Sequence, residues 1–233
     1  MRIPTTIWTD LLDFLFPQYC AACSSRLVEG EEQLCLHCMS RLPYTAHSGR
    51  NDNAVMRLFA DLGCPIQAAA SMLNYSAEKN VQRLIFSLKY YGNRKLAFTM
   101  GRLMAIRSRT ECSEADFLLP VPLHRRRERR RGYNQAEWLC RGMSSVWGTP
   151  VATHALRRRI ATGSQAHKSH AERRAIMQNN VFVTNRIDNL AGKKLLLVDD
   201  VITTGSTLTA CAMPLLNIPE VRLCVLTLAA AAV

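Results

Sequence analysis

Residues 195–208 read LLLVDDVITTGSTL, and they carry the strongest structural signal in the chain. Its four apolar residues 195–198 form a continuous run, which is typical of a parallel strand covered by helices on both faces. Two carboxylates, Asp199 and Asp200, follow at the carboxyl end of the predicted strand, and a loop of small residues then opens a helix. Because open α/β sheets bind ligands at the carboxyl ends of their strands, we expect a ligand site here.

The loop itself indicates a phosphate site. Its small residues can offer successive backbone N–H groups and hydroxyls at a helix N-terminus: Thr203, Thr204, Gly205, Ser206 and Thr207. The acidic pair could accept hydrogen bonds from a ribose diol or help to hold Mg²⁺ indirectly. An acidic pair that only caps the helix, and a loop that is only a turn, are the structural alternatives. The pattern GxxxxGK[ST] is absent, so this is not a Walker A loop.

The combined stretch resembles the phosphoribosyl pyrophosphate (PRPP) signature of type I phosphoribosyltransferases. The resemblance implies that Asp199 and Asp200 are the catalytic carboxylates that hold the ribose hydroxyls, while residues 203–207 cradle the 5′-phosphate. It also implies a glycosyltransferase-class reaction with Mg²⁺, in which a nitrogen nucleophile displaces pyrophosphate through an oxocarbenium-like transition state. Thr203 stands where the hypoxanthine/guanine-salvage members carry an aspartate, their proposed base, which disfavours that subfamily.

The segments around this stretch predict alternating strands and helices. Apolar residues indicate strands at 66–75, 115–122 and 221–229, beside the strand 194–201. Apolar positions spaced three and four apart predict a helix over 77–92, and two further helices are expected over 94–107 and 133–147, the last capped by Asn134. Pro214 should end or kink the helix that follows the phosphate loop. We therefore expect an α/β fold, a type I phosphoribosyltransferase-like parallel sheet flanked by helices.

Positive charge is concentrated in one part of the chain. Residues 116–174 hold 13 lysines and arginines against 4 aspartates and glutamates, which is +9 of the net +12. Arginine binds phosphate bidentately, so the candidate ligands for a leaving pyrophosphate, or for another polyanion, are Arg125, Arg126, Arg127, Arg130, Arg131 and, in LKYYG, Lys89. A DNA backbone would suit the same arginines, and a solvated basic face is the structural alternative.

Four cysteines predict a zinc site. Cys20 and Cys23 form one CxxC pair, and Cys35 and Cys38 form a second pair after eleven intervening residues. Thiolates at this spacing can close a tetrahedral Zn²⁺ site, and four ligands without an open position imply a structural metal. A redox CxxC would need a thioredoxin-like context, which is lacking. About 40 residues bury little core, so the metal would supply stability.

These features divide the chain into two predicted domains. Residues 1–50 hold an amphipathic stretch and the four-cysteine ribbon, and residues 51–233 form the phosphoribosyltransferase-like domain, with a polar linker near 47–53. Asp10 and Asp13 interrupt the amphipathic stretch, which favours a docking helix over a signal peptide. No apolar run reaches the ~20 residues needed to span a bilayer. Cysteines arranged for metal rather than for disulfides predict a reducing, cytoplasmic location.

Four segments in order resemble the ComF/GntX family, which is associated with natural competence and DNA utilisation. They are LKYYGNRKLA, PVPLHRRRERRRGYNQAE, Gln165 with ERRAIMQNNVF, and VDDVITTGSTL. The resemblance implies an N-terminal zinc ribbon before a transferase-like domain; some members carry eight ribbon cysteines, whereas this chain has four suitably spaced ones. The resemblance does not identify the acceptor substrate. The alternative function is a non-catalytic protein that keeps the PRPP-type pocket and engages single-stranded DNA or a competence helicase.

Overall fold

The core of the protein is a four-stranded parallel sheet. The computed structural model describes residues 17–50, 52–75, 79–108, 111–158, 181–184 and 190–231. The strand order is β1-β6-β5-β2, and the strands are β1 (Ala68–Asn74), β6 (Arg222–Ala230), β5 (Lys194–Ile202) and β2 (Phe117–Pro120). Each neighbouring pair is parallel. The predicted parallel sheet is confirmed.

Apolar side chains project from both faces of the sheet. In β5, Leu196 and Val198 enter one hydrophobic core, whereas Leu195 and Leu197 enter another. All four side chains are fully buried. Successive residues of a strand point to opposite faces, so a strand that is covered on both sides needs an unbroken apolar run. This requirement explains the sequence LLLV.

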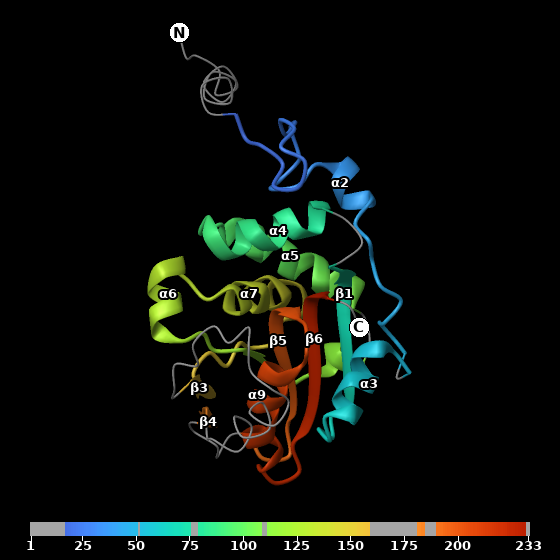
Figure 1. The fold of residues 1–233 in the computed structure, drawn as a ribbon, viewed down its shortest axis with the longest axis vertical. Helices are drawn as coiled ribbons and strands as arrows, with labels where there is room; N and C mark the ends of the chain where they lie inside the picture. The colour runs from blue at the N-terminus through green and yellow to red at the C-terminus, as the bar shows by residue number, and fades with distance from the viewer. Residues whose placement is uncertain are drawn as a thin grey trace.

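Helices cover the two faces. One core contains side chains of α4 (Lys79–Tyr90), α5 (Arg94–Arg107) and α7 (Gln135–Trp147). The other contains side chains of α3 (Ala54–Asp61) and α9 (Ser206–Leu216). Figure 1 shows α4, α5 and α7 gathered together. The helices predicted over 77–92, 94–107 and 133–147 correspond to α4, α5 and α7, and the predicted cap is present, because Ala136 N donates to Asn134 Oδ1 at 3.1 Å.

Two details differ from the sequence patterns. The helix after the phosphate loop does not end at Pro214 but continues to Leu216, because the proline lies in the last turn, where one missing N–H costs a single hydrogen bond. Several elements were not indicated by the sequence: α2 (Leu36–Ser40), α3, α6 (Arg125–Arg131), a 3₁₀ turn (Glu111–Glu114), and the antiparallel pair of β3 (Leu156–Arg158) and β4 (Phe182–Thr184).

The cysteine segment packs against the larger core. Ala22 and Leu34 are fully buried and belong to the same core as Leu84 of α4. Asn93 Nδ2 donates to Gln33 Oε1 at 2.8 Å, which joins this segment to the start of α5. Figure 1 shows the segment beyond α4, on the side away from β5. The ribbon therefore contacts the helical layer directly.

Some predictions fall on parts of the chain that the structure does not describe. The amphipathic stretch 1–16, Gln165 and residues 172–180 lie outside the described residues. None of the described helices combines the length and the hydrophobicity that a membrane span requires.

Candidate functional site

The phosphate loop joins the carboxyl end of β5 to α9. Gly205 caps the helix with φ 71°, in the left-handed region that glycine adopts most readily. A Cβ added there would lie 2.9 Å from Leu62 Cδ1 and 3.1 Å from Leu58 Cδ2, both at the end of α3. Glycine is therefore required here for its backbone conformation and because α3 packs closely against the loop.

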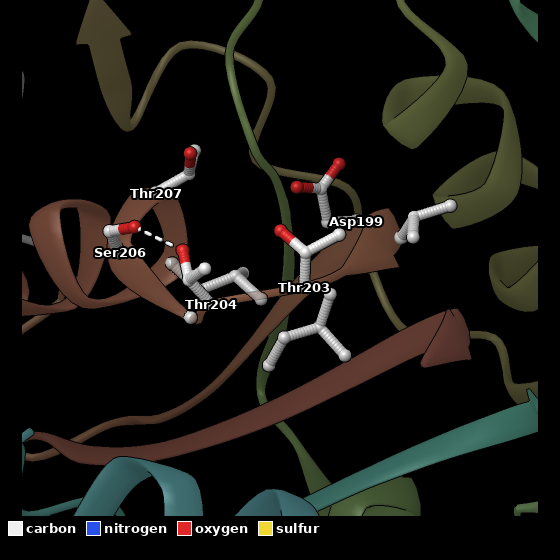
Figure 2. Close-up of a pocket in the computed structure, with 9 residues that line it drawn as sticks. Asp199, Thr203, Thr204, Ser206 and Thr207 are labelled. Atoms are coloured by element: carbon white, nitrogen blue, oxygen red, sulfur yellow. Dashed lines mark hydrogen bonds between the residues drawn. The ribbon is translucent and has the colours of Figure 1, made fainter. Parts of the chain in front are cut away.

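A small open pocket lies over this loop. Its lining includes all five predicted phosphate ligands and one of the two carboxylates, and the full lining is Asp199, Val201, Ile202, Thr203, Thr204, Gly205, Ser206, Thr207 and Leu208. The empty space amounts to about 260 Å³, including its open mouth. Figure 2 shows Asp199 and Thr203 on one side and Thr204, Ser206 and Thr207 on the other. The structure thus gathers hydroxyls and a carboxylate at the N-terminus of an 11-residue helix.

The hydroxyls of the pocket remain accessible. Thr203, Thr204 and Thr207 are exposed. The Thr204 and Ser206 hydroxyls form a hydrogen bond of 2.5 Å, which fixes two oxygens beside the helix terminus. An anion bound here would meet backbone N–H groups, hydroxyl donors and the positive end of the helix dipole.

The acidic pair divides between two faces of β5. Asp199 lines the pocket. Asp200 is buried and pairs with Lys89 Nζ of α4 at 3.6 Å, while its backbone N–H donates to Asp199 Oδ1 at 2.8 Å. Burial, with repulsion from Asp200, raises the pKa of Asp199 to about 8, although Lys89 and Arg131 partly offset this effect. The strand alternation that separates the two cores thus also separates the two carboxylates.

A hydrogen-bond cluster fixes the end of α4 next to Lys89. Tyr133 Oη and Gln135 Nε2 both donate to the Leu88 carbonyl, at 2.6 and 3.1 Å. Asn134 Nδ2 donates to the Val121 carbonyl at 3.1 Å, which joins the start of α7 to the loop that follows β2. Burial and the negative charge of Asp200 raise the pKa of Tyr133. The run YNQ at the start of α7 was the signal for this cluster, but only the Asn134 cap could be inferred from the sequence.

The candidate arginines form a short exposed helix. None of the residues of α6 is buried, and the helix begins after His124 and ends at Gly132, which has φ 77°. Arg131 turns inward, because its Nη1 donates to Gln135 Oε1 at 3.1 Å and its charge lowers the pKa of Asp199. The structure therefore places Arg131 and Lys89 close to the acidic pair.

The other candidate arginines lie further out. Arg125, Arg126 and Arg130 are exposed on α6, whereas Arg127 is partly buried. The charge of Arg127 lowers the pKa of Arg158 at the end of β3, where burial is the larger cause. Asp199 has the opposite effect on Arg158, so this residue also lies in the electrostatic reach of the pocket. In the sequence Arg158 lies in a run of three arginines, 157–159, but its position depends on the β3–β4 pair, which the sequence did not indicate.

The four cysteines converge on one point. The sulfurs of Cys20, Cys23, Cys35 and Cys38 all lie within 4.8 Å of one another, and Cys23 Sγ lies 3.8 Å from Cys35 Sγ. A tetrahedron with Zn–S bonds of about 2.3 Å has sulfur–sulfur edges of about 3.8 Å. The backbone N–H groups of Cys35 and Cys38 point at Cys20 Sγ and Cys35 Sγ, both at 3.4 Å.

The donor set fits a structural zinc ion. Four sulfurs fill a tetrahedral shell and leave no position for a substrate. Hydrogen bonds with Ser25 lower the pKa of Cys23 to about 6, which favours the thiolate that a metal needs. Burial among the other sulfurs raises the pKa of Cys38. Among the described residues, this is the one group of three or more potential ligands that lies close enough to hold a metal.

Comparisons with protein families match both parts of the chain. Residues 11–49 match the double zinc ribbon domain, and residues 140–231 match the phosphoribosyl transferase domain. Together with the parallel sheet, the loop at the end of β5 and the cysteine cluster, these matches define a phosphoribosyltransferase-like protein with an N-terminal zinc ribbon.

Curated relatives identify the family. The chain is 30% identical over 158 residues to the DNA utilization protein YhgH of Escherichia coli O157:H7, which covers 66% of this chain and 67% of that protein. It is 33% identical over 129 residues to competence protein F of Haemophilus influenzae, covering 55% of this chain and 56% of that protein. Competence protein ComFC of Bacillus subtilis is 32% identical over 100 residues, 43% of this chain and 38% of that protein. The chain belongs to the ComF/GntX family.

Solved structures give more distant likenesses. Glutamine PRPP amidotransferase from B. subtilis, complexed with ADP and GMP, aligns with a TM-score of 0.41 and 18% identity, over 60% of this chain and 30% of that one. An allosteric regulatory enzyme of purine biosynthesis aligns with a TM-score of 0.39, also at 18% identity and with the same coverage.

Proposed function

We propose that the chain binds PRPP with Mg²⁺ and transfers its phosphoribosyl group to a nitrogen acceptor. The pocket formed by Asp199 and residues 203–207 is the observation that carries this proposal. The 5′-phosphate would lie on the loop, and the ribose hydroxyls would face the acidic pair. Lys89 and Arg131, both close to that pair, would meet the pyrophosphate.

The reaction breaks the bond between C1 of the ribose and the pyrophosphate oxygen, which keeps the electron pair. The acceptor nitrogen forms the new bond to C1 and loses a proton. Positive charge develops on the ribose ring in the transition state, and an ionised carboxylate of the acidic pair fixed beside the ring stabilises it. Bound Mg²⁺ would neutralise pyrophosphate charge, and the oxygen donors of Asp199 and Asp200 are the kind it prefers.

The proposal is tested by calorimetric titration of PRPP with Mg²⁺ present. We expect saturable binding by the natural chain and no detectable binding by the double variant Asp199→Asn/Asp200→Asn. The matched control is Asp116→Asn, because this carboxylate lies at the opposite end of the sheet, where it accepts from Lys194 N at 2.8 Å. Unchanged PRPP affinity in the folded double variant would refute the proposed site.

A second candidate function is supported by the surface of α6. A non-catalytic role, in which the arginines engage single-stranded DNA or a helicase, fits a helix without buried residues. The relatives are named for DNA utilization and competence, which supports the same role. A cytoplasmic location is part of this proposal, and the nine free cysteines support it.

A further inference from the structure

Three aromatic side chains on and beside α4 form an exposed cluster. Phe86, Tyr90 and Tyr91 are 50%, 54% and 74% exposed. The Phe86 ring centre lies 4.6 Å from that of Tyr90 and 5.6 Å from that of Tyr91, so Phe86 contacts both tyrosine rings. Contiguous exposed apolar surface of this kind marks an interaction site more often than isolated exposed residues do. We call these three residues the aromatic platform.

The platform adjoins α6, although the two are about 40 residues apart in the sequence. The Arg131 guanidinium lies 5.9 Å from the centre of the Tyr90 ring. Arg94 Nη2 donates to the Gly132 carbonyl at 2.5 Å, which joins the start of α5 to the end of α6. Figure 1 shows α6 beside the end of α4. The aromatic platform therefore adjoins the C-terminal end of α6, where Arg131 lies.

The arginines of α6 repel one another. The helix has the sequence RRRERRR, with six arginines and one glutamate. The pairs Arg125/Arg129 and Arg126/Arg130 are four residues apart, a spacing at which like charges destabilise a helix. A chain of phosphates beside α6 would relieve this repulsion and release bound counterions.

We propose that the aromatic platform and α6 together bind a single-stranded nucleic acid, whose bases stack on Phe86, Tyr90 and Tyr91 while its phosphates follow the arginines. This inference rests on the DNA-binding candidate function and names its surface. Rings next to a basic surface are the recurrent means of binding single strands, because every base offers a stacking face. A duplex hides those faces inside its own stack. None of the three rings lines the pocket over the phosphate loop, so these rings are not explained as contacts for a small ligand bound in that pocket.

The test measures the fluorescence anisotropy of a labelled 20-nucleotide oligo-dT strand with the zinc-loaded full chain. The double variant Tyr90→Ala/Tyr91→Ala should bind this strand at least tenfold more weakly, because it loses two of the three rings on which bases would stack. Its salt dependence should match that of the natural chain. In contrast, Arg125→Ala/Arg126→Ala should reduce the slope of log affinity against log salt by ~0.7 for each lost phosphate contact.

Two controls separate stacking from folding and from charge. Tyr91→Phe keeps the ring and should retain affinity, as should Tyr19→Ala, which removes a tyrosine that is 59% exposed in the N-terminal segment. An abasic strand of equal length should bind the natural chain as weakly as the oligo-dT strand binds the double alanine variant.

Each unexpected outcome has one meaning. Equal binding of abasic and natural strands would overturn the platform while leaving the DNA-binding function intact. No binding of any strand would overturn both, and PRPP calorimetry on the same samples would still report on the pocket. Equal, ring-dependent binding of a poly-glutamate peptide would assign the surface to an acidic protein partner instead of a nucleic acid.

Discussion

Helices α6 and α7 follow one another in the chain and are built on opposite principles. Six residues of α7 are buried, and the face that they form packs against α5. No residue of α6 is buried, and it depends on its two caps, His124 and Gly132. Helices usually gain most of their stability from packing an apolar face. The seven residues of α6, six of them arginines, lack the stabilisation that a packed apolar face provides. Their charges are therefore better explained by a ligand than by the fold.

The contact between α7 and α5 is unusually close. A Cβ added at Gly142 would lie 2.1 Å from the Phe98 carbonyl oxygen, and one added at Gly101 would lie 2.1 Å from the Leu139 carbonyl oxygen. Glycine normally weakens a helix, yet both positions lie inside one. Here the backbones approach so closely that no side chain fits between them.

The largest expected effect is therefore that of Gly142→Ala in α7. Alanine is the better helix former by up to ~1 kcal/mol, but the clash with backbone atoms outweighs this gain. We expect the free energy of unfolding to fall by ~3 kcal/mol, as measured by urea denaturation. Gly148→Ala is the matched control, because its added Cβ meets no atom within 4 Å and only the φ of 74° is strained. That variant should lose ~1 kcal/mol; equal losses in both would show that the helices do not touch at Gly142.

The same contrast explains how much the sequence could reveal. Helix α7 has apolar residues at helical spacing and an asparagine cap, both of which are local signals. The phosphate loop is also local, since Asp199 and residues 203–207 come from one continuous segment. The cysteine cluster was predictable because metal ligands have characteristic spacing.

Features that depend on distant segments could not be predicted. Only Tyr133 and Trp138 lie near the arginines in sequence, whereas the structure buries Tyr133 and brings Tyr90 to Arg131. The two carboxylates looked equivalent as neighbours, yet packing buries Asp200 against Lys89 and leaves Asp199 in the pocket. The sequence pattern of α6 is uniform, so it does not indicate which arginine turns inward.

An intermediate effect is expected at Asp199, where burial and the charge of α6 act in opposite directions. Burial and Asp200 raise its pKa to about 8, while Lys89, Arg131 and the Asp200 N–H lower it. The folded state therefore keeps a proton that the unfolded chain loses near pH 4. The stability contributed by this group is complete below pH ~4 and is lost as the pH rises towards 8. Asp199→Asn should lack this loss, a difference of at least ~1 kcal/mol between pH 5 and pH 8.5.

The measurement is urea denaturation of both chains at the two pH values. Asp116→Asn is the control and should leave the pH dependence between pH 5 and pH 8.5 unchanged, because hydrogen bonds from Lys194 N and from Lys193 lower the pKa of Asp116 and place its titration below this range. Its contribution is present at neutral pH and is lost as the pH falls through 4. If Arg131 offsets the burial of Asp199, Arg131→Gln should steepen the loss of stability between pH 5 and pH 8.5. An identical pH slope in the natural chain and in Asp199→Asn would show that burial does not perturb this carboxyl.

The smallest expected effect on stability is that of removing the outer arginines of α6. The triple variant Arg125→Ala/Arg126→Ala/Arg130→Ala should stay within ~0.5 kcal/mol of the natural chain, because exposed substitutions of this kind rarely do more. Alanine favours the helix and removes like-charge pairs, so any change should be a gain that shrinks as salt screens the repulsion. Urea denaturation at 20 and 500 mM NaCl, where the Debye lengths are about 20 Å and 4 Å, measures the change in stability and its dependence on salt. A loss above ~1 kcal/mol would mean that these arginines support the fold as the buried face of α7 does, and the case for a ligand at α6 would fail with it.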